Sequence, residues 1–124
     1  EGSAYGWSDG YRALAEAASL WLDDQIHRDG IKTIKPAAGY SSCPDHTLKD
    51  EIMQMLSGRF GLGIRLTESY AMIPESSICG FIFMHPEAKY SEIRRISKEQ
   101  YDGYASVRGM DEDRARRFLG HLLK

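Results

Sequence analysis

The chain has 124 residues, with 16 Lys and Arg against 18 Asp and Glu, and a formal net charge of −2 at pH 7. This length fits one folded domain with one modest core, and 42% hydrophobic with 27% charged residues is ordinary for a globular protein. The charge balance argues against general nucleic-acid binding, and no apolar run approaches the roughly 20 residues of a membrane helix. Two cysteines, Cys43 and Cys79, are too few for a disulfide framework. We therefore expect a cytoplasmic protein with no nucleic-acid or membrane partner.

The N-terminal region predicts an amphipathic helix over residues 8–28. Apolar residues recur there at three-and-four spacing, at Tyr11, Leu14, Ala15, Ala18, Leu22 and Ile26. Residues 1–8 precede the pattern and are expected to be flexible. Gly30 is placed to end the helix, and residues 32–42 lack a helical period, which indicates a loop or an extended segment.

A second helix is expected from Thr47 to about Gly58. Thr47 and Asp50 have the spacing of a capping box, in which each residue bonds the backbone of the other. Apolar residues on one face of this helix are Leu48, Ile52, Met55 and Leu56.

The hydrophobic period then changes from 3.6 to 2 residues, which is typical of β-strands. Strands are expected over residues 64–72, 78–84 and 89–93, with a turn at residues 74–76. Their connections are short, and parallel strands need a crossover of a dozen residues or more. The pattern therefore predicts an antiparallel meander of about three strands.

Two more helices are expected at the C-terminal end. Ser97 and Gln100 have capping-box spacing, Gly109 is placed to end that helix, and Asp111 is placed to cap the next one. Helices on both sides of an antiparallel sheet in the sequence indicate an α+β fold. Residues 1–124 are expected to form a single domain.

Metal or thiol chemistry is weakly indicated. Cys43, His46, Cys79 and His85 combine two thiols and two imidazoles, but they lack the paired spacings of zinc sites. A Cys43 nucleophile with a histidine base is also conceivable, although one Cys–His pair arises easily by chance. We expect neither a metal site nor a catalytic residue in this chain.

Three stretches together resemble a known family. They are KPAAGYSSCPDHT at residues 35–47, LTESYAMIP at residues 66–74, and CG at 79–80 followed by FMHPEAKY at 83–90. In this order they are similar to the C-terminal activation domain of cobalamin-dependent methionine synthase. The likeness extends over residues 11–123, nearly the whole chain.

The resemblance implies a function. Such a segment binds S-adenosylmethionine and supports the reductive methylation of oxidised cob(II)alamin to methylcobalamin during methionine biosynthesis. It is part of a methyltransferase, the 5-methyltetrahydrofolate–homocysteine methyltransferase, and is expected to be inactive alone. The implied partners are the cobalamin-binding domain of the parent enzyme, which holds the cobalamin, and a flavodoxin-like reductase. Zinc is not expected in this segment.

The resemblance also implies site residues. Those expected at S-adenosylmethionine are Lys35, Ala37, Gly39, Tyr40, Tyr90 and Ser91. Those expected to face cobalamin are Tyr40, Met72, Ile73, Pro74 and Glu75. Lys35 stands where the family has an arginine that engages the methionyl carboxylate. A lysine keeps the charge but loses the two-pronged fork, so weaker or differently oriented binding is expected.

The chain is shorter than the family pattern. The family's domain is normally more than twice this long, so residues 1–124 are expected to be its C-terminal part. The opening Glu1-Gly2-Ser3, without an initiator methionine, also indicates a segment of a longer protein. An alternative function is a non-catalytic module that covers cobalamin and recruits the reductase through a basic cluster. That cluster comprises Arg94, Arg95, Arg108, Arg114, Arg116 and Arg117.

Overall fold

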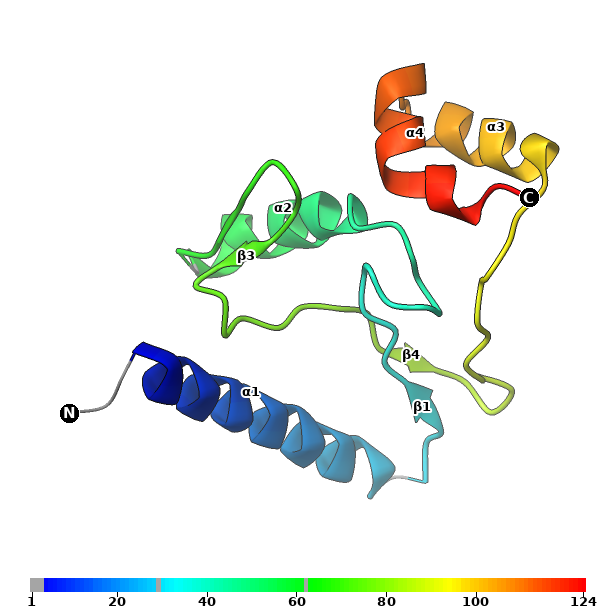
Figure 1. Cartoon of the computed structure of the whole chain (residues 1–124). Helices are drawn as coiled ribbons and strands as arrows, with labels where there is room; N and C mark the ends of the chain where they lie inside the picture. Colours follow the sequence, from blue (N-terminus) through cyan, green and yellow to red (C-terminus); the bar gives the residue numbers. More distant parts are fainter. Residues whose placement is uncertain (1–3, 29, 62) are drawn as a thin grey trace.

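The computed structural model describes residues 4–28, 30–61 and 63–124, and the side chains of residues 4–9 and 57–60 fall outside the description. The elements are α1 (Ala4–His27), β1 (Thr33–Ile34), α2 (Leu48–Phe60), β2 (Arg65–Leu66), β3 (Met72–Ile73), β4 (Phe83–Met84), α3 (Lys98–Val107), α4 (Glu112–Leu119) and the 3-10 helix η1 (Gly120–Leu122). Figure 1 shows α1 at one end of the molecule and α3 with α4 at the other. The predicted α+β class is confirmed.

The predicted N-terminal helix is present as α1, which begins at Ala4. Of the stretch expected to be flexible, residues 1–3 lie outside the described residues. The apolar stripe of α1 is largely exposed, with Leu14 at 68% and Tyr11 at 57% of full accessibility. Contacts with β1 hold the helix, including the Thr33 Oγ1 and His27 Nε2 pair at 3.3 Å.

The strands form two separate antiparallel pairs and not one meander. β1 pairs with β4 in the register Thr33↔Met84 and Ile34↔Phe83. The Phe81 amide donates to the Pro36 carbonyl at 3.0 Å and so extends this pairing along the chain. The partner of β4 therefore comes from the segment that the sequence indicated as a loop or an extended stretch.

Two further strand expectations are corrected. The predicted strand over residues 64–72 is a hairpin of β2 and β3, with Arg65↔Ile73 and Leu66↔Met72 as pairs. It folds back at Tyr70, whose φ of 64° lies in the left-handed region. Residues 89–93 form no strand in the structure. Instead, the Ile93 amide donates to the Ser41 carbonyl at 2.8 Å, so this segment crosses the loop after β1.

The start of α2 also differs from its expected capping box. Thr47 is fully buried, and its hydroxyl donates to Asp45 Oδ1 at 2.7 Å. The Thr47 amide donates to the same carboxylate oxygen at 2.8 Å. Asp50, the other expected member, accepts a bond from the Tyr70 hydroxyl at 2.8 Å. Local bonds of Thr47 to Asp45 and a tertiary bond of Asp50 to Tyr70 therefore replace the expected capping box.

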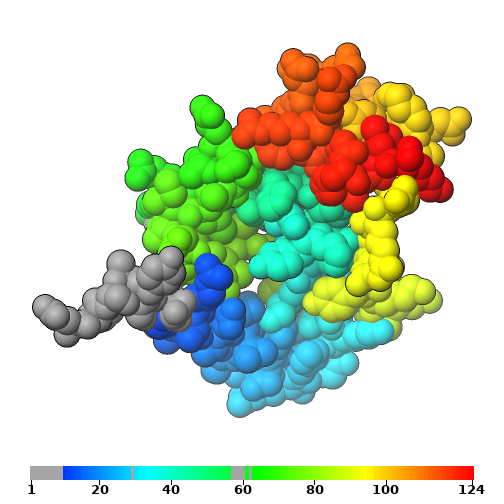
Figure 2. All heavy atoms as spheres, viewed as in Figure 1, coloured from blue at the N-terminus to red at the C-terminus, as the bar shows by residue number. Residues whose placement is uncertain are grey.

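The C-terminal helices follow the sequence prediction closely. Ser97 and Gln100 form a complete capping box on α3, and Gly109 follows the helix with φ +64°. Asp111 caps α4 by accepting from the Arg114 amide. The buried residues of this unit form the main core cluster, which comprises Tyr101, Ala105, Ala115, Leu119 and Leu122. Figure 2 shows residues near 35–50, in cyan, between α1 in blue and these helices in orange and red.

Candidate functional site

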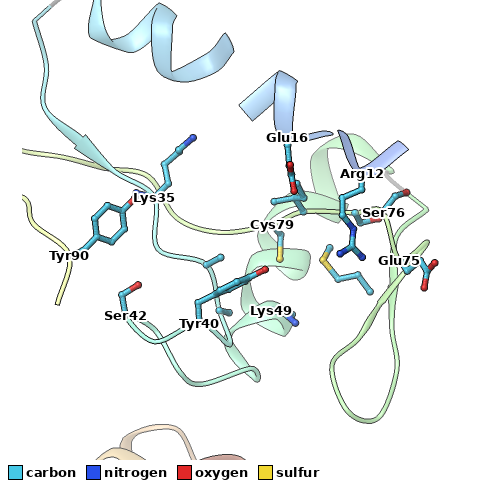
Figure 3. A pocket seen from close by; sticks show the side chains of 15 residues that line it. Arg12, Glu16, Lys35, Tyr40, Ser42, Lys49, Glu75, Ser76, Cys79 and Tyr90 are labelled. Carbon is cyan, nitrogen blue, oxygen red and sulfur yellow. The ribbon is translucent and has the colours of Figure 1, made fainter. Parts of the chain in front are cut away.

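A pocket of about 540 Å³ lies between α1, the loop after β1, and the segment after β3. α1 contributes Arg12 and Glu16, which are one helical turn apart. Figure 3 shows Tyr40 and Cys79 between these side chains and Lys35 with Tyr90 at the other side. The lining thus combines charged groups from a helix with aromatic groups from loops.

The structure brings most of the expected site residues to this one pocket. Those that line it are Lys35, Ala37, Tyr40, Met72, Glu75 and Tyr90. Those outside its lining are Gly39, Ile73, Pro74 and Ser91. The expected S-adenosylmethionine and cobalamin residues therefore share a cavity and its rim.

Gly39 shapes the loop although it does not line the pocket. Its φ is +96°, and a Cβ placed there would lie 2.2 Å from the His46 ring. The Gly39 amide donates to the Cys43 carbonyl at 2.8 Å, which closes a tight turn around Tyr40. The absence of a side chain at Gly39 lets the His46 ring pack directly against the backbone. Tyr40 is thereby presented outward and is 70% exposed.

The Lys35 ammonium group is bound to α1. Its Nζ lies 2.6 Å from Asp23 Oδ2 and 2.9 Å from Ser19 Oγ. Figure 3 shows this side chain directed toward the helix and away from Tyr40. The backbone amide of Lys35 donates to the Tyr90 hydroxyl at 2.6 Å. Lys35 therefore positions both α1 and the Tyr90 ring at this end of the pocket.

Lys49 joins the pocket floor to the hairpin. Its ammonium donates to the Tyr70 carbonyl at 2.8 Å and lies 3.3 Å from His46 Nδ1. The Tyr70 ring is buried and packs edge-on against Phe118 of α4, with centroids 5.1 Å apart. This contact supports the left-handed backbone at Tyr70 and fixes the hairpin that carries Met72.

A buried polar cluster anchors the loop to α3. Asp45 is 3% exposed, and its Oδ2 accepts from the Tyr104 hydroxyl at 2.7 Å. Arg108 places Nε 3.5 Å from the same oxygen and donates to Thr47 Oγ1 at 3.1 Å. Burial and the bond to Asp45 raise the pKa of Tyr104, which keeps its hydroxyl a donor. The C-terminal helices thus hold the pocket loop through Asp45.

His46 predicts a pH dependence of stability. Burial, followed by the charge of Lys49, lowers the pKa of His46 below its ordinary 6.5. The unfolded chain therefore binds more protons than the folded chain just below pH 6.5, so the free energy of unfolding should decrease as pH falls through this range. Urea denaturation between pH 8 and pH 5 measures this slope. A shallower slope in His46→Gln is expected, with exposed His85→Gln as the control, and equal slopes in all three proteins would contradict it.

The thiols are placed for packing. Burial raises the pKa of both Cys43 and Cys79, which disfavours the thiolate that a nucleophile needs.

Across the described residues, no group of three or more His, Cys, Asp or Glu side chains is arranged to hold a metal ion. In the same part of the chain, no helix has the length and apolarity to cross a membrane.

Comparison with known protein families decides the family. Residues 11–109 match the family described as vitamin B12-dependent methionine synthase, activation domain. The chain belongs to this family. The resemblance seen in the motifs is thereby confirmed, and the pocket lies within the matched part of the activation domain.

A solved structure supports the same assignment. The chain is similar to the crystal structure of the MetH reactivation domain bound to AdoHcy, with 32% sequence identity and a TM-score of 0.78. The match covers 90% of this chain and 40% of that one. This activation-domain chain therefore spans about two fifths of the matched structure.

Sequence reasoning missed the two charged residues that α1 brings to the pocket. Arg12 and Glu16 lie outside every motif that carried the resemblance, and charges four apart on a helix are typical of a solvated surface. The one available signal was that both fall on the same face of a predicted helix. Only the docking of α1 beside β1 shows that this face borders a cavity.

Proposed function

We propose that the pocket binds S-adenosylmethionine and presents its methyl group to cobalamin held by a neighbouring domain. The observation that carries the proposal is the convergence of the loop at residues 35–42 with an oppositely charged pair, Arg12 and Glu16, on α1. A methionyl group carries both a carboxylate and an ammonium, so it needs one cationic and one anionic partner. The match to a reactivation domain bound to AdoHcy supports the same ligand class.

Glu16 is the proposed acceptor for the ligand ammonium. It lines the pocket, and a carboxylate accepts charge-assisted hydrogen bonds. Tyr90, held by the Lys35 amide at the opposite end, is proposed to contact the adenosine. Ala37 and the turn at Gly39 and Tyr40 form the backbone wall between these ends.

The exposed rim is proposed to face cobalamin. Tyr40, Met72 and Glu75 line the pocket, and Tyr40 is 70% exposed. Ile73 follows Met72 in β3 and is 41% exposed. Cobalamin, when held by its own domain, supplies the metal centre that is reduced and methylated. The residues of this chain position the methyl donor and, once the mouth is covered, exclude water. None of them needs to act as acid, base or nucleophile.

The proposal places residues 1–124 within the C-terminal part of a larger activation domain. Trp21 is 63% exposed and Leu14 is 68% exposed on α1, an apolar surface suited to burial against further protein. The parent would be a cytoplasmic methyltransferase, and the segment would be inactive without its cobalamin-binding domain. The coverage of 40% of the matched chain agrees with this view.

The alternative docking function receives less support. Much of its basic cluster is paired with carboxylates of this chain, namely Arg94 with Glu92, Arg108 with Asp45 and Glu51, Arg114 with Asp50, and Arg116 with Glu112. Paired charges steer an acidic partner less effectively than free ones. Recruitment of a flavodoxin-like reductase is therefore proposed for the parent enzyme as a whole, without a surface defined among the described residues.

Calorimetric titration of S-adenosylmethionine tests the proposed function. We expect saturable binding that Glu16→Gln weakens roughly tenfold, the loss of one charge-assisted bond. The matched control is Glu99→Gln on α3, an exposed position outside the pocket, which should bind like the unchanged chain. Absence of saturable heat, or equal affinity in the Glu16→Gln variant, would count against the pocket as the ligand site.

A further inference from the structure

We infer that Arg12, and not Lys35, receives the carboxylate at the amino-acid end of the ligand. This inference rests on the proposed function and names the residue that anchors the methionyl group in this chain. It departs from the expectation for Lys35 that the resemblance implied. Three basic side chains line the pocket, namely Arg12, Lys35 and Lys49, and they differ in the acceptors they already contact.

The ammonium groups of the two lysines already contact acceptor atoms of this chain. Lys35 Nζ contacts Asp23 Oδ2 at 2.6 Å, Ser19 Oγ at 2.9 Å and the Ser19 carbonyl at 3.3 Å. These three contacts match the three donors of an ammonium group. Lys49 likewise donates to the Tyr70 carbonyl at 2.8 Å. The Lys35 ammonium therefore reaches a ligand only by giving up one of its three contacts. The Lys49 ammonium, which also lies 3.3 Å from His46 Nδ1, keeps a donor but is held toward the hairpin.

Releasing Lys35 would also leave Asp23 without its cation. The Asp23 side chain is 21% exposed, and its Oδ1 has no hydrogen-bond partner among the described residues. Breaking a partly buried ion pair leaves an uncompensated charge, so exchanging Asp23 for a ligand carboxylate brings little net gain. Lys35 therefore stays on α1 when the pocket is occupied.

The position of Arg12 and the geometry of its guanidinium group suit a carboxylate ligand. Figure 3 shows Arg12 at the side of the pocket where Glu75 and Ser76 lie, with its guanidinium in the space between these residues and Cys79. Within the described part of the chain, no hydrogen bond or ion pair engages this side chain. Its planar fork matches a carboxylate with two parallel bonds, which a lysine cannot make. Glu16, one turn further along α1, then lies where the ligand ammonium on the adjacent carbon is proposed to bind.

The arrangement also leaves the opposite end for the nucleoside. Tyr90 and Lys35 lie together at the side of the pocket away from Arg12 and Glu75 (Figure 3). With the carboxylate at Arg12, the adenosine extends toward the Tyr90 ring. The ligand then spans the pocket past Tyr40, whose exposed ring borders the mouth.

A cycle of two variants and two ligands tests the assignment. S-adenosylmethionine and decarboxylated S-adenosylmethionine are titrated by calorimetry into the unchanged chain, Arg12→Gln and Lys35→Gln. We expect Arg12→Gln to lose about tenfold or more in affinity for S-adenosylmethionine but to stay within about twofold for the decarboxylated ligand. Lys35→Gln should weaken both ligands by the same factor. Arg28→Gln, at the end of α1 and outside the pocket, is the control and should change neither.

The outcomes separate the two proposals. If the unchanged chain binds neither ligand, the proposed function fails and this inference fails with it. If the unchanged chain binds and Arg12→Gln binds S-adenosylmethionine equally well, only the assignment of Arg12 is overturned. The same conclusion follows if the carboxylate-dependent loss belongs to Lys35→Gln.

Discussion

Replacing Gly39 with alanine is expected to destabilise the fold by about 2–4 kcal/mol, because two costs combine at this position. The φ of +96° disfavours any residue with a Cβ, and that Cβ would lie 2.2 to 2.8 Å from ring atoms of His46. Either the His46 ring or the loop that presents Tyr40 must move. The midpoint of urea denaturation measures the change in stability, and a parallel titration measures the loss of ligand affinity.

Gly103 provides the matched control for this change. It lies inside α3 with nothing within 4 Å of an added Cβ, so Gly103→Ala should leave stability unchanged or raise it by up to about 1 kcal/mol. Equal effects of the two substitutions would show that the close packing at Gly39 does not govern the loop.

Replacing Asp45 with alanine is expected to cost about 3–5 kcal/mol. The carboxylate accepts from the Thr47 amide, the Thr47 hydroxyl and the Tyr104 hydroxyl, and it compensates the largely buried charge of Arg108. Its removal leaves several buried donors without an acceptor. Because this cluster joins the pocket loop to α3, ligand affinity should fall together with the free energy of unfolding.

The control for Asp45 is an exposed ion pair. Glu92 pairs with Arg94 at 2.5 Å, with both side chains more than half exposed, so Glu92→Ala should change stability by less than about 0.5 kcal/mol. An effect of Asp45→Ala as small as that of Glu92→Ala would contradict the anchoring role of the buried cluster.

Features that depend on interactions between neighbouring residues were predicted correctly from the sequence, whereas features that depend on residues far apart in the chain were not. The capping box of Ser97 and Gln100 and the cap at Asp111 are local, and both were predicted correctly. The pairing of Thr33 with Met84 joins positions far apart in the chain, and no local period signals it. Asp50 shows the same limit, since it accepts from the hydroxyl of Tyr70, 20 residues further along the chain, instead of completing a capping box with Thr47.

The site residues show the same difference between what a local motif predicts and what tertiary packing determines. The loop carrying Lys35, Ala37 and Tyr40 was located through its motif, and the structure places it on the pocket. The direction of the Lys35 side chain was not predictable, because Ser19 and Asp23 bind it only after α1 has docked. A charged residue on a helix acquires its role from what the helix packs against.

An amide-resolved nuclear magnetic resonance titration with S-adenosylhomocysteine locates the ligand site on this chain. We expect saturable shifts at residues 35–42 and 75–79 and at Glu16, which border the pocket. Residues of α3 and α4 around a second cavity of about 690 Å³, such as Tyr101 and Ala115, should stay unchanged. Absence of saturable shifts, or shifts confined to α3 and α4, would contradict the assignment of the ligand site.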